Sequence, residues 1–501
     1  MKIVEKIGND VSIISLPSEN ILIGDYISIK DEERNSQLVV QVYDERYLDH
    51  SSLIEDMVRD EVMRASTDWV ESDPLQINTI SYFIQDIRLL KCKIHGSIDD
   101  SRFTSSVSWL PSRVKASLHK IPVANMMQLA GQSGLRKINI GKTHDGEQLH
   151  IFAESLDGQL NIITGKKESG KSHLSKLIAS ELVKHGAYVF VFDLNNEYGG
   201  LDKNIDGSPN KNVKCITLSP SESLVFKLKY LGLSSMTGLL SHVLDIPGAS
   251  LREFIKMWKV LESQDSISMR SLGDLIQTSR CNEYVRDAIY SRFHTLLSSK
   301  LFSDDKSFVI EDIFSEFREG CLVVISLGQI SPLVRQMVVE IFLTKLVDLL
   351  EKKGIPPIFL FAEEAHLYLR ETYWGDIITR MRHFGIFTTF ITNEPNAIDD
   401  GIFRQVDNIF LFNFTNDIDL EKIGRVTMID TETVKSMVRT LPRKSCLALG
   451  RAVANLPVKI EVAQMDTVTL GQTRLFFGSK KKSFNSKEQI TSLNTKTCLN
   501  K

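Results

Sequence analysis

The sequence predicts an α/β fold with a mainly parallel sheet, a small β-barrel before it and a helical insertion within it. Two observations support this prediction. From about residue 135 to residue 465, near-continuous apolar runs alternate with helical patterns, as expected for strands that are buried on both faces. One of these runs leads into a glycine-containing loop that opens a helix, which is the local arrangement that binds phosphate groups.

Residues 1–125 are predicted to form the small barrel. Turn signals separate short runs that are apolar or alternate between apolar and polar residues. These runs cover residues 11–16, 21–29, 38–43 and 87–98. Residues 53–65 have the spacing of an amphipathic helix inserted between strands. An irregular β-rich region without closure is the alternative to a barrel.

Residues 126–465 are predicted to form the α/β core. Its expected strands cover residues 160–164, 187–193, 322–327, 358–362, 387–392 and 409–412. Residues 230–315 show helical spacing and no strand pattern, so we expect the helical insertion there. Residues 446–449 and 458–462 are expected to pair as a hairpin at the end of the core. Residues 466–501 are polar and lysine-rich, which predicts a solvated C-terminal tail.

The composition is that of a globular protein with room for about two or three domains. The chain has 501 residues and a net charge of −3, so nucleic-acid binding would require a local basic surface rather than a general field. No apolar run reaches the roughly 18 residues of a membrane span, and the N-terminus lacks an apolar leader, which favours a cytoplasmic location. The six cysteines form no C-x-x-C pair, so neither a zinc site nor a disulfide framework is expected.

The strongest motif is the sequence GKKESGKS, which has the form G-x-x-x-x-G-K-S. Gly165 and Gly170 permit backbone conformations that a side chain would obstruct. Lys171 can place a positive charge near the β and γ phosphates, and the Ser172 hydroxyl can bind Mg²⁺. The motif therefore predicts a nucleotide site. Its expected binding residues are Gly165, Lys166, Lys167, Glu168, Ser169, Gly170, Lys171, Ser172 and His173.

Polar clusters follow three predicted strands, where ligands of parallel sheets bind. Glu363 and Glu364 form the strongest cluster, and we assign Glu363 to the metal and Glu364 to the base that activates water. Asn393 can sense the γ-phosphate because its amide both donates and accepts hydrogen bonds, with a structural role as the alternative. Asp193 and Glu197 either help to place the water or metal, or form an ordinary turn.

Two arginines are candidates for stabilising the phosphoryl group that is transferred in a neighbouring subunit. Arg380 and Arg382 lie within residues 374–384, where apolar residues recur at helical spacing. At about 3.6 residues per turn, the arginines flank the apolar stripe on opposite sides, so only one is expected to reach a neighbour's nucleotide. Simple surface exposure is the alternative for each arginine.

These motifs together resemble the HerA-like family of hexameric ATPases, which are relatives of the FtsK DNA translocases. Besides the phosphate loop, the resemblance rests on Val191-Phe192-Asp193…Glu197-Tyr198, Glu363-Glu364-Ala365-His366, Arg382-His383-Phe384-Gly385, Thr392-Asn393-Glu394-Pro395 and Leu441-Pro442-Arg443-Lys444. It implies a RecA-like P-loop ATPase core that uses ATP and Mg²⁺. It also implies that Lys171, Glu364 and Asn393 are catalytic, with Arg382 acting in trans.

The resemblance implies an ATP-driven translocase or helicase that acts on double-stranded DNA as a hexameric ring. Such proteins work in DNA-end processing and repair, often beside a NurA-type nuclease. Two other classes stay open. One is a nucleotide-dependent assembly ATPase that organises a nuclease or a defence effector, and the other is a translocase of the conjugation or secretion type.

The chain departs from the family's pattern at three positions. Family members usually carry glutamine at the position of Asn393, so the sensor is shorter here by one methylene. Glycine is common at the position of Glu168, whose carboxylate we expect to point outward because it lies within an anion site. Some members have a basic residue at the position of Gln159. None of these departures removes a metal ligand or the loop lysine.

Overall fold

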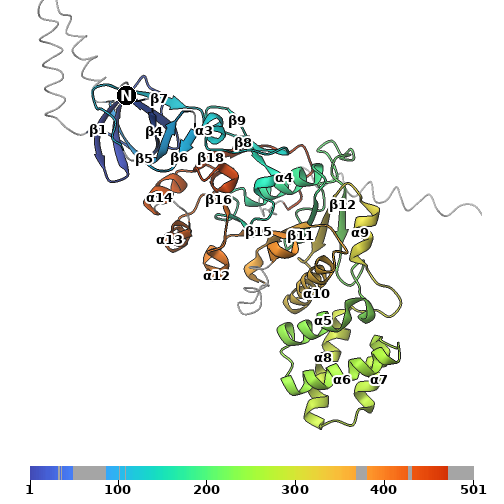
Figure 1. Ribbon diagram of the computed structural model, residues 1–501. Coiled ribbons are helices and arrows are strands. Elements are labelled where there is room, and N and C mark those ends of the chain that lie inside the picture. Colours follow the sequence, from blue (N-terminus) through green and yellow to red (C-terminus); the bar gives the residue numbers. More distant parts are fainter. Residues whose placement is uncertain are drawn as a thin grey trace, which may run out of the picture.

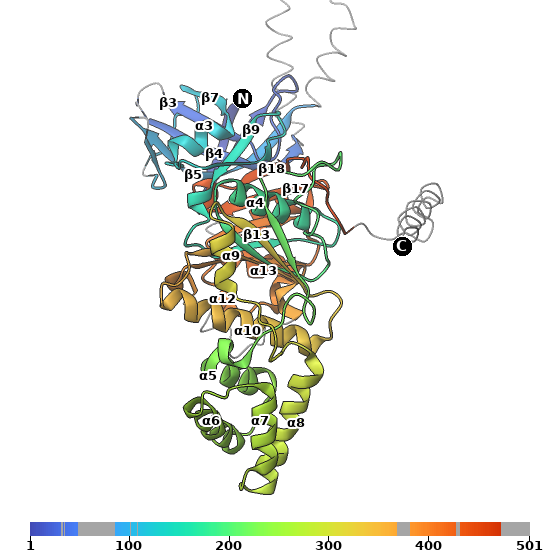
Figure 2. The same ribbon diagram turned by 90° about the vertical axis from the view of Figure 1, so that its right-hand side faces the viewer.

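The computed structural model describes residues 1–31, 34, 36–48, 86–100, 102–107, 109–367, 381–426 and 431–471. An antiparallel N-terminal sheet, a large mixed sheet with helices packed on it, and a helical domain of residues 228–299 follow one another along the molecule (Figure 1). The helical domain lies within the insertion predicted for residues 230–315, apart from its first two residues. The N-terminal sheet and the helical domain lie at opposite ends of the large sheet in both views (Figure 2). No helix among the described residues is long and apolar enough to cross a membrane.

The N-terminal sheet is half of the predicted barrel. Its strands are β1 (Lys2–Ile7), β2 (Asp10–Ser15), β3 (Tyr26–Asp31), β4 (Ser36–Tyr47), β5 (Arg88–Asp99), β6 (Arg102–Thr104) and β7 (Ala116–Ile121). They pair in the order β1-β2-β5-β4-β3-β7, and β6 pairs with β5. Two register shifts bend β4 against β5, yet no described residues pair β1 with β7, so the sheet curls without closing. The helix predicted over residues 53–65 lies outside the described residues.

The large sheet has eleven strands among the described residues and is mixed, with six parallel and four antiparallel pairs. Along the sheet these are β12 (Cys215–Leu218), β13 (Cys321–Ser326), β11 (Tyr188–Asp193), β14 (Ile358–Glu363), β15 (Ile386–Thr392), β10 (Asn161–Thr164), β16 (Asn408–Phe412), β17 (Ser445–Gly450), β18 (Val458–Val462), β8 (Lys137–Lys142) and β9 (Gln148–Phe152). Strands from β12 to β16 in this order are parallel, as the apolar runs predict. From β16 to β9 each pair is antiparallel. Hairpins connect β17 with β18 and β8 with β9, whereas α13 and α14 lie between β16 and β17 in the chain.

The apolar side chains of the helices pack mainly in two hydrophobic cores. They are α3 (Val123–Leu129), α4 (Lys171–Lys184), α5 (Leu228–Gly238), α6 (Gly248–Ser263), α7 (Met269–Thr278), α8 (Glu283–Ser299), α9 (Ile310–Glu316), α10 (Pro332–Glu351), α12 (Asp400–Phe403), α13 (Asp417–Val426) and α14 (Thr431–Arg439). Phe190 and Phe192 of β11 pack in the core that includes α10, whereas Val189 and Val191 pack in the core that includes α4. Alternate residues of one strand thus serve opposite faces, as the strand period requires.

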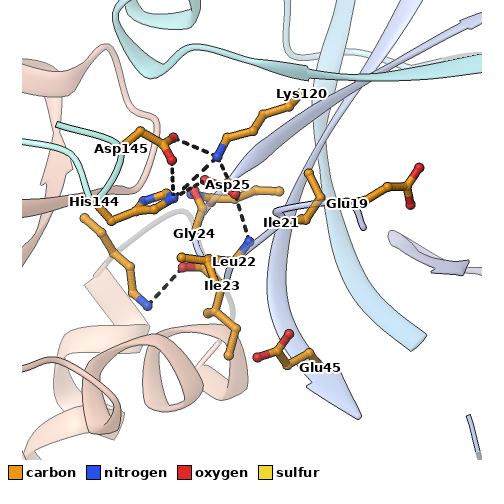
Figure 3. Close-up of polar contacts among 12 residues, drawn as sticks. Glu19, Ile21, Leu22, Ile23, Gly24, Asp25, Glu45, Lys120, His144 and Asp145 are labelled. Atoms are coloured by element: carbon orange, nitrogen blue, oxygen red, sulfur yellow. Dashed lines mark hydrogen bonds and ion pairs between the residues drawn. The ribbon is translucent and has the colours of Figure 1, made fainter. Parts of the chain in front are cut away.

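A cluster of ion pairs joins the N-terminal sheet to the turn between β8 and β9 (Figure 3). The ammonium of Lys120 lies 2.9 Å from the Asp25 carboxylate and 2.7 Å from that of Asp145, and His144 Nε2 lies 3.2 Å from Asp25. Burial alone would lower the pKa of Lys120, but hydrogen bonds to Asp145 and Asp25 raise it. The Lys120 ammonium already forms ion pairs with both acids. We therefore interpret the cluster as a clasp, that is, a set of ion pairs that holds the two domains together, rather than as a metal site.

A second set of contacts joins the N-terminal sheet to the hairpin of β17 and β18. Tyr26 and Gln41 each donate a hydrogen bond to the carbonyl of Pro457, over 2.8 and 2.7 Å. Lys459 Nζ donates to the carbonyl of Ile23 over 3.0 Å. All three donors are largely buried. Pro457 lies directly before β18, and Ile23 lies in the loop before β3. The junction is therefore built from specific polar contacts that fix the orientation of the two sheets.

We expect the change Asp25→Ala to destabilise the protein by about 1–3 kcal/mol, because Lys120 and the backbone N–H of Leu22 both lose a buried, charged acceptor. Chemical denaturation checks this value. The control is Asp10→Ala, which removes the more exposed pair with Lys93 at 3.1 Å and should cost less than about 1 kcal/mol. Equal losses in the two variants would contradict the assignment of a clasp.

Candidate nucleotide site

The phosphate loop follows β10, which lies between β15 and β16 in the large sheet. Gly165 and Gly170 have φ values of 154° and 122°, and Gly170 is the N-cap of α4. A Cβ atom on Gly165 would lie 2.5 Å from the Cβ of Phe412, and one on Gly170 would lie 3.0 Å from Cε1 of the same ring. Both glycines are therefore required because Phe412, at the end of β16, packs directly under the loop.

Backbone hydrogen bonds fasten the loop at both of its sides. The N–H of Lys166 donates to the carbonyl of Asn413 over 3.1 Å, and the N–H of Lys444 donates to the carbonyl of Ser169 over 2.9 Å. Asn413 and Lys444 flank the loop on the side of β16 and β17. Neither was predicted as a site residue, because contacts of this kind involve the backbone and leave no signature in the side chains.

Lys171 lies inside the curl of the loop. Its ammonium donates to the carbonyls of Gly165 and Lys166, over 2.8 and 3.0 Å. Burial lowers the pKa of Lys171, and the charges of Glu364 and Glu363 act against this effect. The lysine predicted to contact the β and γ phosphates thus lies between the loop and the two predicted acids.

The remaining loop residues differ in their surroundings. Lys166, Lys167 and Glu168 are exposed, so the Glu168 carboxylate lies on the solvent side of the loop, where the anion-site argument places it. Glu168 has a φ of 60°, in the left-handed region that favours glycine. The ring of His173 contacts the carbonyl of Ala463 at 2.7 Å, so this side chain is held against the segment that follows β18.

Two buried acids lie side by side at the carboxyl ends of β11 and β14. The side chains of Asp193 and Glu363 are each 1% exposed, and the two strands pair in parallel up to Phe192 and Ala362. Burial raises the pKa of Glu363, and the charges of Asp193 and Glu197 raise it further. Buried carboxylates at neighbouring strand ends are hard oxygen donors of the kind that binds Mg²⁺.

The Asp193 carboxylate holds the turn that follows β11. It accepts hydrogen bonds from the backbone N–H groups of Glu197 and Tyr198, both over 3.0 Å. Asp193 therefore stabilises an ordinary turn, which is the structural alternative that the sequence offers for it. Glu197 points instead to Lys176, whose ammonium lies 3.2 Å from its carboxylate.

Lys176 and Tyr198 are site residues to which the sequence analysis gave no role, although Tyr198 belongs to one of the motifs of the family resemblance. Lys176 is 4% exposed and lies one helical turn beyond Ser172, where its positive charge opposes the rise in the pKa of Glu363 that burial causes. The Tyr198 hydroxyl is fully buried and hydrogen-bonds to Ser175 over 2.5 Å. A lysine on a helix is normally solvated, so only its spacing of four residues from Ser172 could have indicated this position.

Glu364 points toward the end of β15 rather than toward β11. Its φ is 46°, and its N–H donates to the carbonyl of Ile391 over 2.7 Å, so the reversal of direction after Glu363 is fixed by the sheet. The Glu364 carboxylate accepts from the N–H of Asn393 over 3.4 Å and lies 3.7 Å from His366. A non-glycine residue in this conformation is strained, and such strain concentrates at functional sites.

Asn393 and His366 complete this second group. His366 Nδ1 lies 3.1 Å from the Thr392 hydroxyl, which orients the imidazole beside Glu364. The side-chain oxygen of Asn393 is buried and has no hydrogen-bond partner among the described residues. A buried amide oxygen without a partner is costly, and a bound group with a donor would remove that cost.

Arg382 lies away from these residues. It precedes β15, so it is at the edge of the sheet opposite the phosphate loop. There it lines a small cavity together with Gln159 and Asp407, and its side chain is exposed. Within one chain it cannot reach the loop, whereas a contact with a neighbour's nucleotide fits its place. Arg380 lies outside the described residues.

Comparisons with known proteins agree with this architecture. Residues 163–346 match the family model described as the central domain of helicase HerA. The DNA double-strand break repair helicase HerA of Saccharolobus solfataricus is 22% identical over 360 residues, which cover 66% of this chain and 71% of that protein. A probable helicase of Methanocaldococcus jannaschii is 20% identical over 479 residues, which cover 90% of this chain and 88% of that protein.

A solved structure shows the same fold. The bacterial conjugative coupling protein TrwBdeltaN70 superposes with a TM-score of 0.51 at 12% identity, over 71% of this chain and 94% of that one. The comparisons confirm the predicted resemblance to the HerA-like family, and they confirm the α/β core with a phosphate loop.

We expect Glu168→Gly to strengthen ATP binding by about fivefold. The change removes an exposed like charge near the phosphates, worth about 1 kcal/mol when solvent screens it, and places glycine at a left-handed position. Titration with a fluorescent ATP analogue checks the affinity. Glu168→Gln removes only the charge, so comparing the two variants separates the effect of the charge on affinity from the effect of the glycine backbone. Unchanged affinity in both variants would contradict this interpretation.

Proposed function

We propose that the protein is an ATP hydrolase that moves along double-stranded DNA as a ring of identical subunits. The observation that carries this proposal is that two adjacent acids, Glu363 and Glu364, lie in different environments. Glu363 is buried among the carboxylates beside α4, while Glu364 turns toward Asn393 and His366. One acid thus suits a metal ion and the other suits a water molecule, which is what hydrolysis of a nucleotide requires.

The chain's own residues supply the parts of the reaction. Backbone N–H groups of the loop and the N-terminus of α4 bind the phosphates, and Lys171 compensates their charge. Ser172 and Glu363 would hold Mg²⁺, which neutralises phosphate charge. Glu364 orients the attacking water and accepts its proton as the oxygen bonds to the γ-phosphorus, and ADP departs with the bridging oxygen. Asn393 contacts the γ-phosphate or the water through its buried amide oxygen or its NH₂ group.

The position of Arg382 supports a ring. An arginine at the edge opposite the phosphate loop contributes to hydrolysis only when a neighbour places its loop against that edge. By its resemblance to the HerA-like family, we propose a hexamer. We also propose three units in the chain: an N-terminal unit of residues 1–125, the ATPase core of residues 126–465 with its helical insertion, and a tail of residues 466–501.

The similarity to proteins named DNA double-strand break repair helicases supports DNA as the substrate and DNA-end processing as the process. A NurA-like nuclease is the partner that we propose on the same resemblance. An assembly ATPase that organises an effector, or a conjugation-type translocase, is the alternative. Proteins of conjugation share the fold, so the fold itself does not distinguish these functions.

We expect Glu364→Gln to lower kcat for ATP hydrolysis by about 10²- to 10⁴-fold with little change in ATP affinity, because the amide cannot accept the proton of water. A phosphate-release assay and an equilibrium binding titration check the two quantities. The control is Glu319→Gln, which changes an acid 88% exposed before β13, at the opposite end of the strands from the site, and should leave kcat within about twofold. Wild-type turnover in Glu364→Gln would contradict the assignment.

We expect double-stranded DNA to stimulate the hydrolysis rate, and the stimulation to weaken as salt rises because phosphate contacts release counterions. Rates measured with and without a linear duplex at several salt concentrations check this. A hydrolysis rate that is the same with and without DNA at every salt concentration would contradict the proposed DNA translocase and favour the assembly ATPase. That alternative predicts that a non-hydrolysable ATP analogue supports complex formation as well as ATP does.

A further inference from the structure

A second exposed arginine lies at the edge of the sheet that carries Arg382. Arg451 begins the short turn η5 (Arg451–Val453), directly after β17, and its side chain is 64% exposed. Gly450 before it has a φ of 101°, and a Cβ at this position would lie 2.0 Å from the carbonyl oxygen of Asp407. Only glycine permits this close approach, so the direction in which the chain leaves β17 is fixed.

A buried polar network holds the turn that presents Arg451. Asn161 and Asn408, the first residues of β10 and β16, are 1% and 0% exposed. The amide NH₂ of Asn408 donates to Asn161 Oδ1 over 2.8 Å, and Asn408 Oδ1 accepts from the N–H of Ala452 over 2.7 Å. Fully paired amides in a core rigidify their surroundings. The turn is thereby anchored to the same strand, β10, that carries the phosphate loop at its other end.

Asp407 links Arg451 to the surroundings of Arg382. Arg451 Nε lies 3.6 Å from Asp407 Oδ1, and Asp407 lines the small cavity together with Arg382. The other carboxylate oxygen of Asp407 accepts from the N–H of Leu160 over 3.1 Å, so this acid is itself held by the residue that precedes β10. At 3.6 Å the ion pair is longer than a hydrogen bond, so the Arg451 guanidinium keeps its N–H donors for another acceptor.

We propose that Arg451 acts with Arg382 as a second cation in trans, contacting the phosphates of the nucleotide that the neighbouring copy of this chain binds. The proposal rests on the proposed ring ATPase and adds a residue to its shared site. Three features support it: Arg451 is exposed at the edge opposite its own phosphate loop, it is presented by a rigid turn, and it carries unengaged donors in a planar fork. A fork of this kind binds phosphate oxygens in pairs.

Another arginine near the same edge serves as a contrast. Arg136 lines a pocket with Tyr188 and Phe387, near the starts of β11 and β15. Its guanidinium lies 3.0 Å from Glu154, and Glu154 also accepts the backbone N–H groups of Leu135 and Arg136. Arg136 is thus engaged within its own chain. It is the matched control for the loss of one exposed positive charge.

The test compares Arg451→Ala and Arg136→Ala in the full chain. We expect Arg451→Ala to lower kcat by about tenfold or more, while the mass of the assembly in solution and the ATP affinity of its own loop stay unchanged. Arg136→Ala should leave kcat within about twofold. Arg451→Lys should recover only part of the rate, since an ammonium lacks the planar fork. A kcat in Arg451→Ala equal to that of the wild type would overturn the proposal.

Mixing of subunits tests the action in trans. Lys171→Ala removes a subunit's own loop lysine and keeps its Arg451, so mixing it with Arg451→Ala should rebuild some complete sites and raise the rate above either variant alone. Mixing Lys171→Ala with Arg382→Ala provides the same test for Arg382. Recovery with Arg382→Ala but not with Arg451→Ala would overturn the proposal and leave the ring ATPase intact. An inactive or monomeric wild type would instead overturn the proposed function.

Discussion

The contact between the phosphate loop and the end of β16 is the constraint on which the rest of the site depends. Phe412 packs so closely under Gly165 and Gly170 that neither position accepts a side chain. The backbones of Asn413 and Lys444 then fasten the loop on the same side. Because the loop cannot shift relative to β16, the start of α4 and the ammonium of Lys171 are fixed with respect to the acids at the neighbouring strand ends.

The two acids at the end of β14 show how one strand supplies two environments. Glu363 completes the strand and is buried among Asp193, Glu197 and Lys176, whereas the left-handed backbone of Glu364 turns the next side chain to β15. Successive residues of a strand point to opposite faces of the sheet. The backbone must therefore change direction sharply at Glu364 if Glu363 and Glu364 are both to face the same nucleotide site. The strain at Glu364 is the cost of that arrangement.

Much of the parallel core was predictable from the sequence, because strands buried on both faces and the loop motif leave strong local signals. In the antiparallel half the hairpin of β17 and β18 was predicted, but β8 and β9 were not, since they are short and only partly apolar. The parallel edge strand β12 was missed for the same reason. The predicted barrel is an open sheet, because β1 and β7 do not pair among the described residues. Pairing between the two edge strands depends on tertiary structure and has no local signal in the sequence. Within the site, Glu363, Glu364 and Lys171 carried motif signals. Lys176, Asn413 and Arg451 acquire their places only through folding, from helix spacing, a backbone contact and a turn.

The hairpin of β17 and β18 has a mechanical consequence. Its first strand begins beside Lys444, which is bonded to the loop at Ser169, and its second strand begins beside Pro457, which is bonded to Tyr26 and Gln41 of the N-terminal sheet. Paired strands resist stretching far more than a loop does, because each displacement would break ladder hydrogen bonds. The hairpin is therefore a stiff lever, with the nucleotide at one end and the N-terminal sheet at the other.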